Sequence, residues 1–335
     1  MDDKILLAHG SGGKLQQQLI NKVFLPAFSN PILNRLEDQA SLNLPPGRVA
    51  FTTDSYVVNP LFFPGGNIGR LAVCGTVNDL AVGGAKPLYL STGFIIEEGF
   101  PVSILSDIVN SMKKAADEAE VLIVTGDTKV VEKGQADQLF INTAGVGVIP
   151  DGIIMGASSA CPGDVVLVSG YIGDHGIAVM SAREGLKLQS SIASDAAPLN
   201  GMIRALIAAA PDVRVMRDPT RGGVATTLNE LAQYSKVSIK ISERNLPVRE
   251  EVAAACEVLG FDPLYIANEG KIIAIVPQNQ AQAALQALRA HHYGHHAAII
   301  GEVTQNHPGK VYLETAIGGT RIVDMLAGAQ LPRIC

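Results

Sequence analysis

The sequence predicts a mixed α/β protein of the α+β class that folds as two domains. A length of 335 residues suits about two domains. Strand-like apolar runs alternate with helical patterns along both halves of the chain. The stretch 150–164, with its glycines, two serines and Pro162, is typical of a linker. We therefore divide the chain into an N-terminal segment with a helix (1–30), a first domain (31–150), a second domain (158–325) and a tail (326–335).

The apolar periodicity indicates where the elements lie. In the first half we expect helices at 15–28, 68–84 and 103–119 and strands at 49–59, 88–96, 121–124 and 139–148. In the second half we expect strands at 165–168, 213–216, 237–241, 272–276, 299–303 and 311–314, and helices at 177–184, 199–210, 224–234, 249–259 and 280–290. Polar residues follow several of these strands directly, which is where α/β folds gather their binding sites.

The composition argues against several classes of partner. The net charge is −6 and no basic block offsets it, which argues against nucleic acids and membrane surfaces. No apolar run reaches the ~18 residues of a membrane span. The cysteines at 74, 161, 256 and 335 have neither disulfide nor zinc spacing, so we expect a reducing cytoplasm. With 34 glycines and only 5% aromatic residues, binding loops lined by backbone are expected.

Three glycine loops lie between an apolar run and a helix. His9–Lys14 (HGSGGK) suits either a phosphate loop or a flexible helix entry, and its spacing does not match a Walker A loop. Gly173–Gly176 (GDHG) suits a phosphate loop or a plain tight turn. In Arg217–Gly223 (RDPTRGG), Thr220 can cap the following helix. An Asp, two Arg and the exposed amides of a helix N-terminus within seven residues could together hold a metal ion and a phosphate.

Carboxylates recur beside these turns and strand ends, and cations lie near them in the sequence. The acids are Asp54, Asp79, Asp127 and Asp218, and the cations are Lys129, Arg217 and Arg221. Hard carboxylates beside backbone amides suit Mg²⁺ and a triphosphate. Clustered acids in a chain of net charge −6 would repel an anion unless a divalent metal lay between them. The sequence therefore predicts a Mg-ATP site outside the P-loop and protein-kinase plans.

Three features of the sequence can each be interpreted in two ways. Asp79 is either a paired or metal-bound acid in a small-residue helix or an exposed polar position, and Glu269 is either a satisfied turn residue or a base in a dry site. The histidine tract 291–296 is similar to a metal site, but Gly294 interrupts it, which favours a solvated loop.

The tail ends in Pro332-Arg333-Ile334-Cys335. Its small residues and Pro332 predict a flexible arm that spans up to roughly 33 Å when extended. The thiol of Cys335 is not expected to be a well-packed core cysteine. The arm can carry the sulfur from the surface into a cleft, and a frayed end is the alternative.

These motifs resemble a known family over nearly the whole chain. They are HGSGGK at 9–14, FTTDSYVV at 51–58, GTVNDLAVGGAKP at 75–87, VTGDTKVV at 124–131, FINTAG at 140–145, GDHG at 173–176, DPTRGGV at 218–224, NEGK at 268–271 and PRIC at 332–335. The Asp, GDTK and RGG motifs resemble the superfamily of aminoimidazole ribonucleotide synthetase, selenophosphate synthetase and thiamine-monophosphate kinase. The PRIC ending resembles its HypE family of hydrogenase maturation proteins.

The resemblance implies a two-domain aminoimidazole ribonucleotide synthetase-like fold whose N-terminal sheet forms a barrel with a second copy in a homodimer. It implies ATP and Mg²⁺ between the halves, near the dimer interface. It also implies a reaction. The carbamoyltransferase HypF loads a carbamoyl group onto Cys335, ATP-dependent dehydration converts the group to a thiocyanate, and the cyanide passes to iron on a HypC–HypD scaffold complex.

The resemblance assigns roles to single residues. Cys335 would carry the carbamoyl group, and Glu269 would take the first proton with help from Lys129, which equally suits a phosphate clamp. The metal would bind Asp54, Asp79, Asp127 and Asp218, and these residues would bind the nucleotide together with Asn78, Asn142, Gly176, Arg221, Gly222 and Gly223. Two rival functions are a kinase or synthetase acting on a diffusible substrate and a nucleotide-sensing scaffold that presents its thiol without chemistry.

Overall fold

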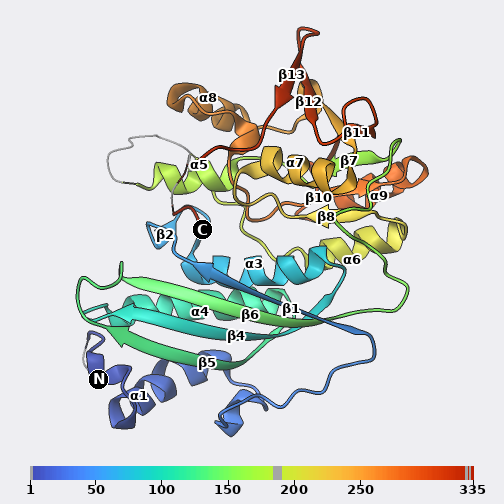
Figure 1. Ribbon diagram of the computed structural model, residues 1–335. Coiled ribbons are helices and arrows are strands. Elements are labelled where there is room, and N and C mark those ends of the chain that lie inside the picture. Colours follow the sequence, from blue (N-terminus) through green and yellow to red (C-terminus); the bar gives the residue numbers. More distant parts are fainter. Residues whose placement is uncertain (1–2, 184–190, 329–330, 332) are drawn as a thin grey trace.

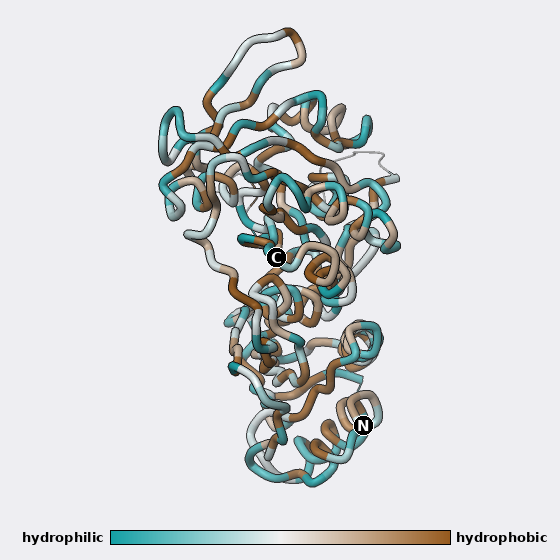
Figure 2. The backbone as a smooth tube through the Cα atoms, turned by 90° about the vertical axis from the view of Figure 1, so that its right-hand side faces the viewer, coloured by the Kyte–Doolittle hydropathy of each residue, from teal (hydrophilic) through white to brown (hydrophobic). Residues whose placement is uncertain are grey.

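The structure is a computed structural model that describes residues 3–183, 191–328, 331 and 333–335. Its N-terminal and C-terminal halves are stacked, and residue 335 lies between them (Figures 1 and 2). Each half combines one main sheet with helices. This arrangement confirms the predicted two-domain mixed α/β fold.

The N-terminal half is built on a four-stranded sheet in the order β1-β6-β4-β5. The elements are η1 (Leu7–His9), α1 (Gly13–Leu19), the π-helical turn η2 (Ile20–Phe24), α2 (Leu25–Phe28), η3 (Leu33–Arg35), β1 (Arg48–Tyr56), β2 (Phe62–Phe63), β3 (Gly66–Asn67), α3 (Ile68–Val82), β4 (Lys86–Glu97), α4 (Val102–Glu118), β5 (Leu122–Val131) and β6 (Leu139–Ile149). The sheet is mixed, because β4 and β5 run parallel and the other neighbours antiparallel. Helices α3 and α4 cover one of its faces (Figure 1).

The C-terminal half is built on a seven-stranded sheet in the order β13-β12-β9-β11-β7-β10-β8. The elements are β7 (Val165–Val168), α5 (Asp174–Ser181), α6 (Asn200–Ala209), β8 (Val215–Arg217), α7 (Gly223–Ser235), β9 (Ser238–Ser242), η4 (Glu243–Asn245), α8 (Glu250–Leu259), η5 (Pro263–Tyr265), β10 (Ile273–Val276), η6 (Gln278–Gln280), α9 (Ala281–Ala290), β11 (Ala298–Thr304), β12 (Val311–Glu314) and β13 (Thr320–Val323). Strand β13 was not predicted, because three of its four residues are exposed and the sequence there carries little apolar pattern.

The predicted helix at 15–28 is not continuous. It begins at Gly13 and passes through the π-helical turn before ending as α2. Pro26 in α2 has no N–H to donate to the preceding turn, so a regular α-helix cannot continue through that position.

The predicted strand at 121–124 is longer than expected. Strand β5 continues to Val131, because β4 runs beside it from Tyr89 to Glu97. Asp127 and Lys129 therefore lie within a strand, and the prediction that they follow a strand end is wrong.

Helix α3 lies at the junction of the halves, where it contacts the first sheet, α4, α6 and β8. Its N-cap is Asn67, whose side chain accepts a hydrogen bond from the backbone N–H of Arg70. Every residue of α3 is buried except Arg70 and Asp79. Nine residues at about 100° each make two and a half turns, so these two side chains leave the helix on opposite sides.

The other face of the four-stranded sheet carries exposed apolar side chains. Val49, Phe51 and Ile95 are 60%, 69% and 45% exposed. Strands β1 and β5 form the two edges of this sheet in the described part of the chain. An apolar face with two open edges is a surface that usually requires a partner.

No helix in the described ranges has both the length and the apolar character needed to cross a bilayer.

Candidate active site between the two halves

A cavity of about 450 Å³ lies where the two halves meet. The N-terminal half lines it with Asp54, Ser55 and Tyr56 of β1 and with Gly75 and Asp79 of α3, and the C-terminal half with Arg217, Asp218, Thr220, Arg221, Thr226, Thr227, Glu230, Glu269 and Cys335. The structure thus brings together seven residues predicted from the sequence: Asp54, Asp79, Arg217, Asp218, Arg221, Glu269 and Cys335.

The loop between β8 and α7 places Asp218 and Arg221. Gly222 and Gly223 both have positive φ, and Gly222 occupies the N-cap of α7. Thr220 does not have the predicted capping role, because its hydroxyl donates to Asp218 Oδ2 at 3.0 Å. Its carbonyl accepts from the N–H of Gly223 at 3.2 Å. Thr220 therefore holds the Asp218 side chain within the loop.

Three carboxylates approach each other in this cavity. Burial, Asp218 and Asp54 raise the pKa of Asp79 to about 7, and the hydroxyl of Thr52, which donates to Asp79 at 2.8 Å, opposes the shift. Burial also raises the pKa of Asp218, with Asp54 contributing. Acids with raised pKa values on a shared cavity are typical of a site that receives a cation.

The acids alone do not form a complete metal site. Within the described residues, no three His, Cys, Asp or Glu side chains lie close enough to hold a metal ion by themselves. A cation bound here would therefore take further ligands from another molecule, as Mg²⁺ does from nucleotide phosphates. The hydroxyl of Thr226 is buried without a hydrogen-bond partner among the described residues and lines the same cavity.

Glu269 is a buried acid. It is 5% exposed, and its Oε1 has no hydrogen-bond partner in the described part of the chain. Burial raises its pKa well above the usual value, Asp218 and Asp195 add to the shift, and Arg221 opposes it. Its backbone is held on both sides, since the N–H donates to Asp195 and the carbonyl accepts from Asn78. The geometry favours a base in a dry site over a turn residue.

Cys335 is 7% exposed and packs with the hydrophobic core of the N-terminal half. The expectation that this thiol is not well packed is therefore wrong. Its sulfur accepts a hydrogen bond from Nε of Arg221 at 3.3 Å. Burial and the carboxyl of Glu269 raise the pKa of Cys335 to about 11, although Arg221 lowers it.

The end of the tail runs antiparallel beside the chain that follows β1. The N–H groups of Val57 and Asn59 donate to the main-chain oxygens of Cys335 and Arg333, each at 3.2 Å. The Arg333 side chain donates from Nε to Val57 O at 2.9 Å and forms an ion pair with Asp137. These contacts rule out a frayed end for 333–335, whereas Pro332 lies outside the described residues.

Lys129 and Asp127 lie away from this cavity. Asn142 does not line it either, but its amide donates to Asp54 O and Ser55 Oγ of the lining, at 2.8 and 3.1 Å. Asp127 aligns with Gly93, Asn142 and Ser55 across the sheet, whereas Asp54 aligns with Thr143 in the neighbouring row. Asp127 and Lys129 therefore point from the open face, opposite to Asp54, and β5 is three strand spacings, roughly 14 Å, from β1. Lys129 and Asp127 form an exposed ion pair with each other, at 3.3 Å between Nζ and Oδ2.

The remaining predicted nucleotide contacts have structural partners. The Asn78 side chain is buried and binds the backbone of Ala197, Leu199 and Glu269. The N–H of Gly176 donates to the carbonyl of Ala267 at 3.1 Å. Neither group is free to meet a phosphate in this arrangement.

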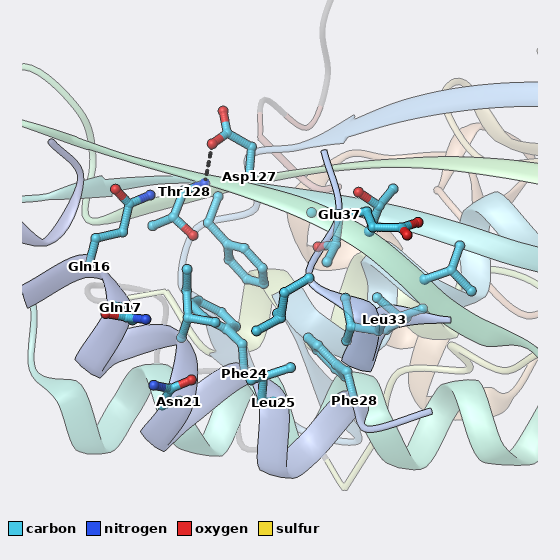
Figure 3. Close-up of a pocket in the computed structure, with 18 of the residues that line it drawn as sticks. Gln16, Gln17, Asn21, Phe24, Leu25, Phe28, Leu33, Glu37, Asp127 and Thr128 are labelled. Carbon is cyan, nitrogen blue, oxygen red and sulfur yellow. Dashed lines mark hydrogen bonds between the residues drawn. The ribbon is translucent and has the colours of Figure 1, made fainter. Parts of the chain in front are cut away.

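Two further cavities lie outside this site. One of about 660 Å³ separates the N-terminal helices from β4 and β5, and Gly13 and Lys14 of the HGSGGK loop line it. Figure 3 shows its wall, with Thr128 towards the helices and Asp127 on the other side of the strand. The other, about 610 Å³, is lined by Arg70 of α3 and by His292, His295 and His296 of the histidine tract.

Sequence reasoning missed a buried ion pair behind Glu269. Lys271 Nζ lies 3.0 Å from Asp195 Oδ2, and both side chains are less than a tenth exposed. Although burial acts to raise it, Lys271 keeps the pKa of Asp195 below its usual value. Lys271 was visible as a cation in an otherwise apolar run, whereas nothing in the sequence around Asp195 indicated its role.

Comparisons with known proteins identify the family. The family models described as AIR synthase related protein, N-terminal domain and C-terminal domain, match residues 36–149 and 161–314. Carbamoyl dehydratase HypE of Azotobacter vinelandii is 55% identical over 329 residues, which covers 98% of this chain and 96% of that protein. The chain belongs to the HypE family.

Solved structures of HypE proteins have the same fold. The structure of hydrogenase maturation protein HypE in complex with ATP matches with a TM-score of 0.95 and 51% identity, covering 98% of this chain and 99% of that one. HypE in a HypE–HypF complex matches with a TM-score of 0.81 and 54% identity, covering 92% and 99%.

Proposed function

We propose that this chain is an ATP-dependent carbamoyl dehydratase that acts on a carbamoyl group carried by its own Cys335. The product would be a thiocyanate that supplies a cyanide ligand for iron in NiFe-hydrogenase maturation. The observation that carries the proposal is the position of the Cys335 sulfur, which shares one cavity with Arg221 and with the buried, unpartnered Glu269 Oε1. Membership of the HypE family supports the same activity.

ATP and Mg²⁺ fit the groups around the thiol. Asp54, Asp79 and Asp218 supply hard oxygen ligands. The raised pKa values of Asp79 and Asp218 favour a cation beside them, and Thr226 adds a buried hydroxyl without a partner in the described part of the chain. Arg221 supplies the positive charge that a phosphate needs. When bound, Mg²⁺ neutralises charge on the phosphates. A HypE relative of known structure is described as a complex with ATP.

The reaction can be balanced with these groups. The carbamoyl oxygen attacks the γ-phosphorus of ATP and releases ADP, and the loss of one N–H proton leaves an O-phosphorylated thiocarbimidate. Removal of the second N–H proton expels phosphate and leaves S–C≡N. Glu269 is placed to take the first proton, because it lines the same cavity as Cys335. Its raised pKa makes the ionised carboxylate a stronger base than an exposed one.

Lys129, which the resemblance assigns to assist Glu269 or to clamp a phosphate, does not line the cavity of its own copy. Lys129 lies on the open face at the far edge of the sheet. If the open faces of two copies close into a barrel, with β1 of each beside β5 of the other, the partner's Lys129 and Asp127 come next to the strand that carries Asp54. We therefore propose a homodimer in which Lys129 acts on the other copy's site, as a proton acceptor or as a phosphate clamp.

The partners follow from the same reaction. We propose HypF as the carbamoyl donor and a HypC–HypD complex as the cyanide acceptor, and a HypE relative is described as a complex with HypF. We also propose a cytoplasmic location, since the cysteines of the described ranges are free, as in a reducing compartment.

Intact mass tests this function directly. The chain is loaded by HypF with a carbamoyl donor, repurified, and incubated with Mg-ATP. We expect the loaded protein to lose the mass of one water with one ADP formed, and Cys335→Ser to take up no carbamoyl group. Retention of the carbamoyl mass would support a scaffold, and ATP turnover with a diffusible acceptor in Cys335→Ser would support the small-molecule kinase or synthetase.

A further inference from the structure

We infer that His175, in the GDHG motif, is a positioning residue that seats the tail by holding the backbone carbonyl of Ile334. The inference rests on the proposed function, because seating this carbonyl places the next residue, Cys335, in the cavity. It also gives the GDHG motif a role other than the phosphate loop or plain tight turn that the sequence suggested.

The contact is short and fully enclosed. Nε2 of His175 lies 2.9 Å from the carbonyl oxygen of Ile334, and His175 has no exposed surface. The Ile334 side chain is also buried, with 4% exposure, and Phe63 meets the edge of the imidazole at a ring-centre distance of 5.6 Å. A carbonyl this deep has lost its water and depends on a protein donor.

The hydrogen-bond network fixes which nitrogen carries the proton. The Ile334 carbonyl can only accept, so Nε2 must donate. Ser194 Oγ lies 2.8 Å from Nδ1, and the same oxygen accepts from the N–H of Ala196 at 3.2 Å. Its own proton is therefore free to go to Nδ1. A neutral ring protonated at Nε2 satisfies every partner, and burial lowers the pKa of His175, which favours that neutral form.

The rest of the motif makes room for the tail. A Cβ on Gly176 would lie 2.4 Å from Ile266 Cγ2 and 3.2 Å from Leu331 Cδ1, so only glycine lets the helix approach both. The carbonyl of Arg333 is held from the other side by Asn59 N and by Nη2 of Arg183, at 3.2 and 3.0 Å. These contacts are made to backbone carbonyls of the tail and not to the Cys335 side chain. We therefore expect them to hold the tail whether the thiol is free or carbamoylated.

Two substitutions separate the two nitrogens of the ring. In His175→Gln the amide nitrogen takes the place of Nε2 and can donate to Ile334, whereas in His175→Asn the amide reaches only the position of Nδ1. Both remove the ring that packs on Phe63, so they are matched for lost packing. Ser194→Ala keeps the ring and removes only the donor that orients it.

The readout is alkylation of Cys335 by iodoacetamide without ATP or partners. The background is Cys161→Ser, because Cys161 is exposed while Cys74 and Cys256 are buried. We expect Cys335 to react about tenfold faster in His175→Asn than in the parent, which corresponds to the loss of one buried hydrogen bond. We expect His175→Gln to stay within about twofold of the parent and Ser194→Ala to fall between them.

Equal acceleration in His175→Gln and His175→Asn would overturn the inference, because ring packing would then explain the effect. Parent-like labelling in both His175→Asn and Ser194→Ala would also overturn it. Single-turnover dehydration of the loaded protein should decline in the same order as labelling rises, with rescue in His175→Gln. If the parent shows no dehydration but labelling follows the expected order, the proposed function is wrong and the positioning role of His175 is still supported.

Discussion

Nε of Arg221 lies 3.3 Å from Sγ of Cys335 and donates a hydrogen bond to it. Even so, burial and Glu269 raise the pKa of the thiol to about 11. The seated thiol is therefore almost wholly protonated at neutral pH and is a poor nucleophile. We therefore propose that the carbamoyl group is loaded with the tail withdrawn, and that the buried position of the tail serves the later dehydration step.

Arg221→Ala should slow dehydration by about 10²–10³, the usual loss for a donor aimed at developing negative charge. Arg221→Lys keeps the charge but not the fixed N–H direction, so we expect an intermediate rate. The measurement is single-turnover loss of water from the loaded protein by mass. A rate unchanged in Arg221→Ala would show that the guanidinium only contacts the free thiol.

Glu269→Gln should abolish the first deprotonation while making the folded protein more stable at high pH. Burial raises the pKa of Glu269 above its unfolded value, so the folded state binds this proton more tightly. The stability that this provides is complete below about pH 4 and is lost as the pH rises. Glutamine cannot ionise, so its Tm advantage over the parent should grow from about pH 5 to 8. Unimpaired dehydration in Glu269→Gln would remove the residue from the base role.

Asp79→Asn should weaken binding of Mg-ATP and remove part of its pH dependence. The pKa of Asp79 is raised to about 7, so a cation that binds beside it must displace a proton near neutral pH. We expect calorimetry in buffers of different ionisation enthalpy to show less proton release for the variant. The control is ATP without Mg²⁺, for which the two proteins should release similar amounts. Equal release with Mg²⁺ would place the cation away from Asp79.

Mixed dimers test whether Lys129 acts on the other copy. Lys129→Ala and Glu269→Gln homodimers should each be inactive, but a dimer with one copy of each has one site with both groups intact. Equal mixing with subunit exchange should therefore restore roughly a quarter of the parent sites. If Lys129 served its own copy, both sites of the mixed dimer would be defective and no activity would return.

Gly223→Ala should disturb the loop that carries Asp218 and Arg221. Gly223 has φ +59°, and a Cβ there would lie 2.5 Å from Leu264 O. Gly318 is the control, since it also has positive φ but nothing lies within 4 Å. We expect Gly318→Ala to lower the free energy of unfolding by about 1 kcal/mol, and Gly223→Ala to lower it by roughly 1–3 kcal/mol more. Equal losses in urea melts would contradict the close approach.

Local pattern predicted the elements and part of the site. Apolar periodicity placed α3, α4 and most strands within a few residues, because each of those elements buries a continuous apolar face. The motifs also indicated Asp54, Asp79, Asp218 and Glu269 as site residues from the sequence alone. Such residues are recognisable because burying an acid in an apolar segment costs free energy unless the acid is paired or binds a ligand.

Only the tertiary structure decided which of these residues meet. The register of β5 places Asp127 and Lys129 on the face opposite Asp54, and a one-residue shift in a strand would reverse that result. The burial of Cys335 and its hold by His175 depend on surfaces from both halves, which no short stretch of sequence contains. The sequence by itself determined the family, the elements and the acids, because these follow from residue type and local spacing. The contacts that hold the tail and the position of Lys129 outside the cavity follow from long-range packing, so they required the fold.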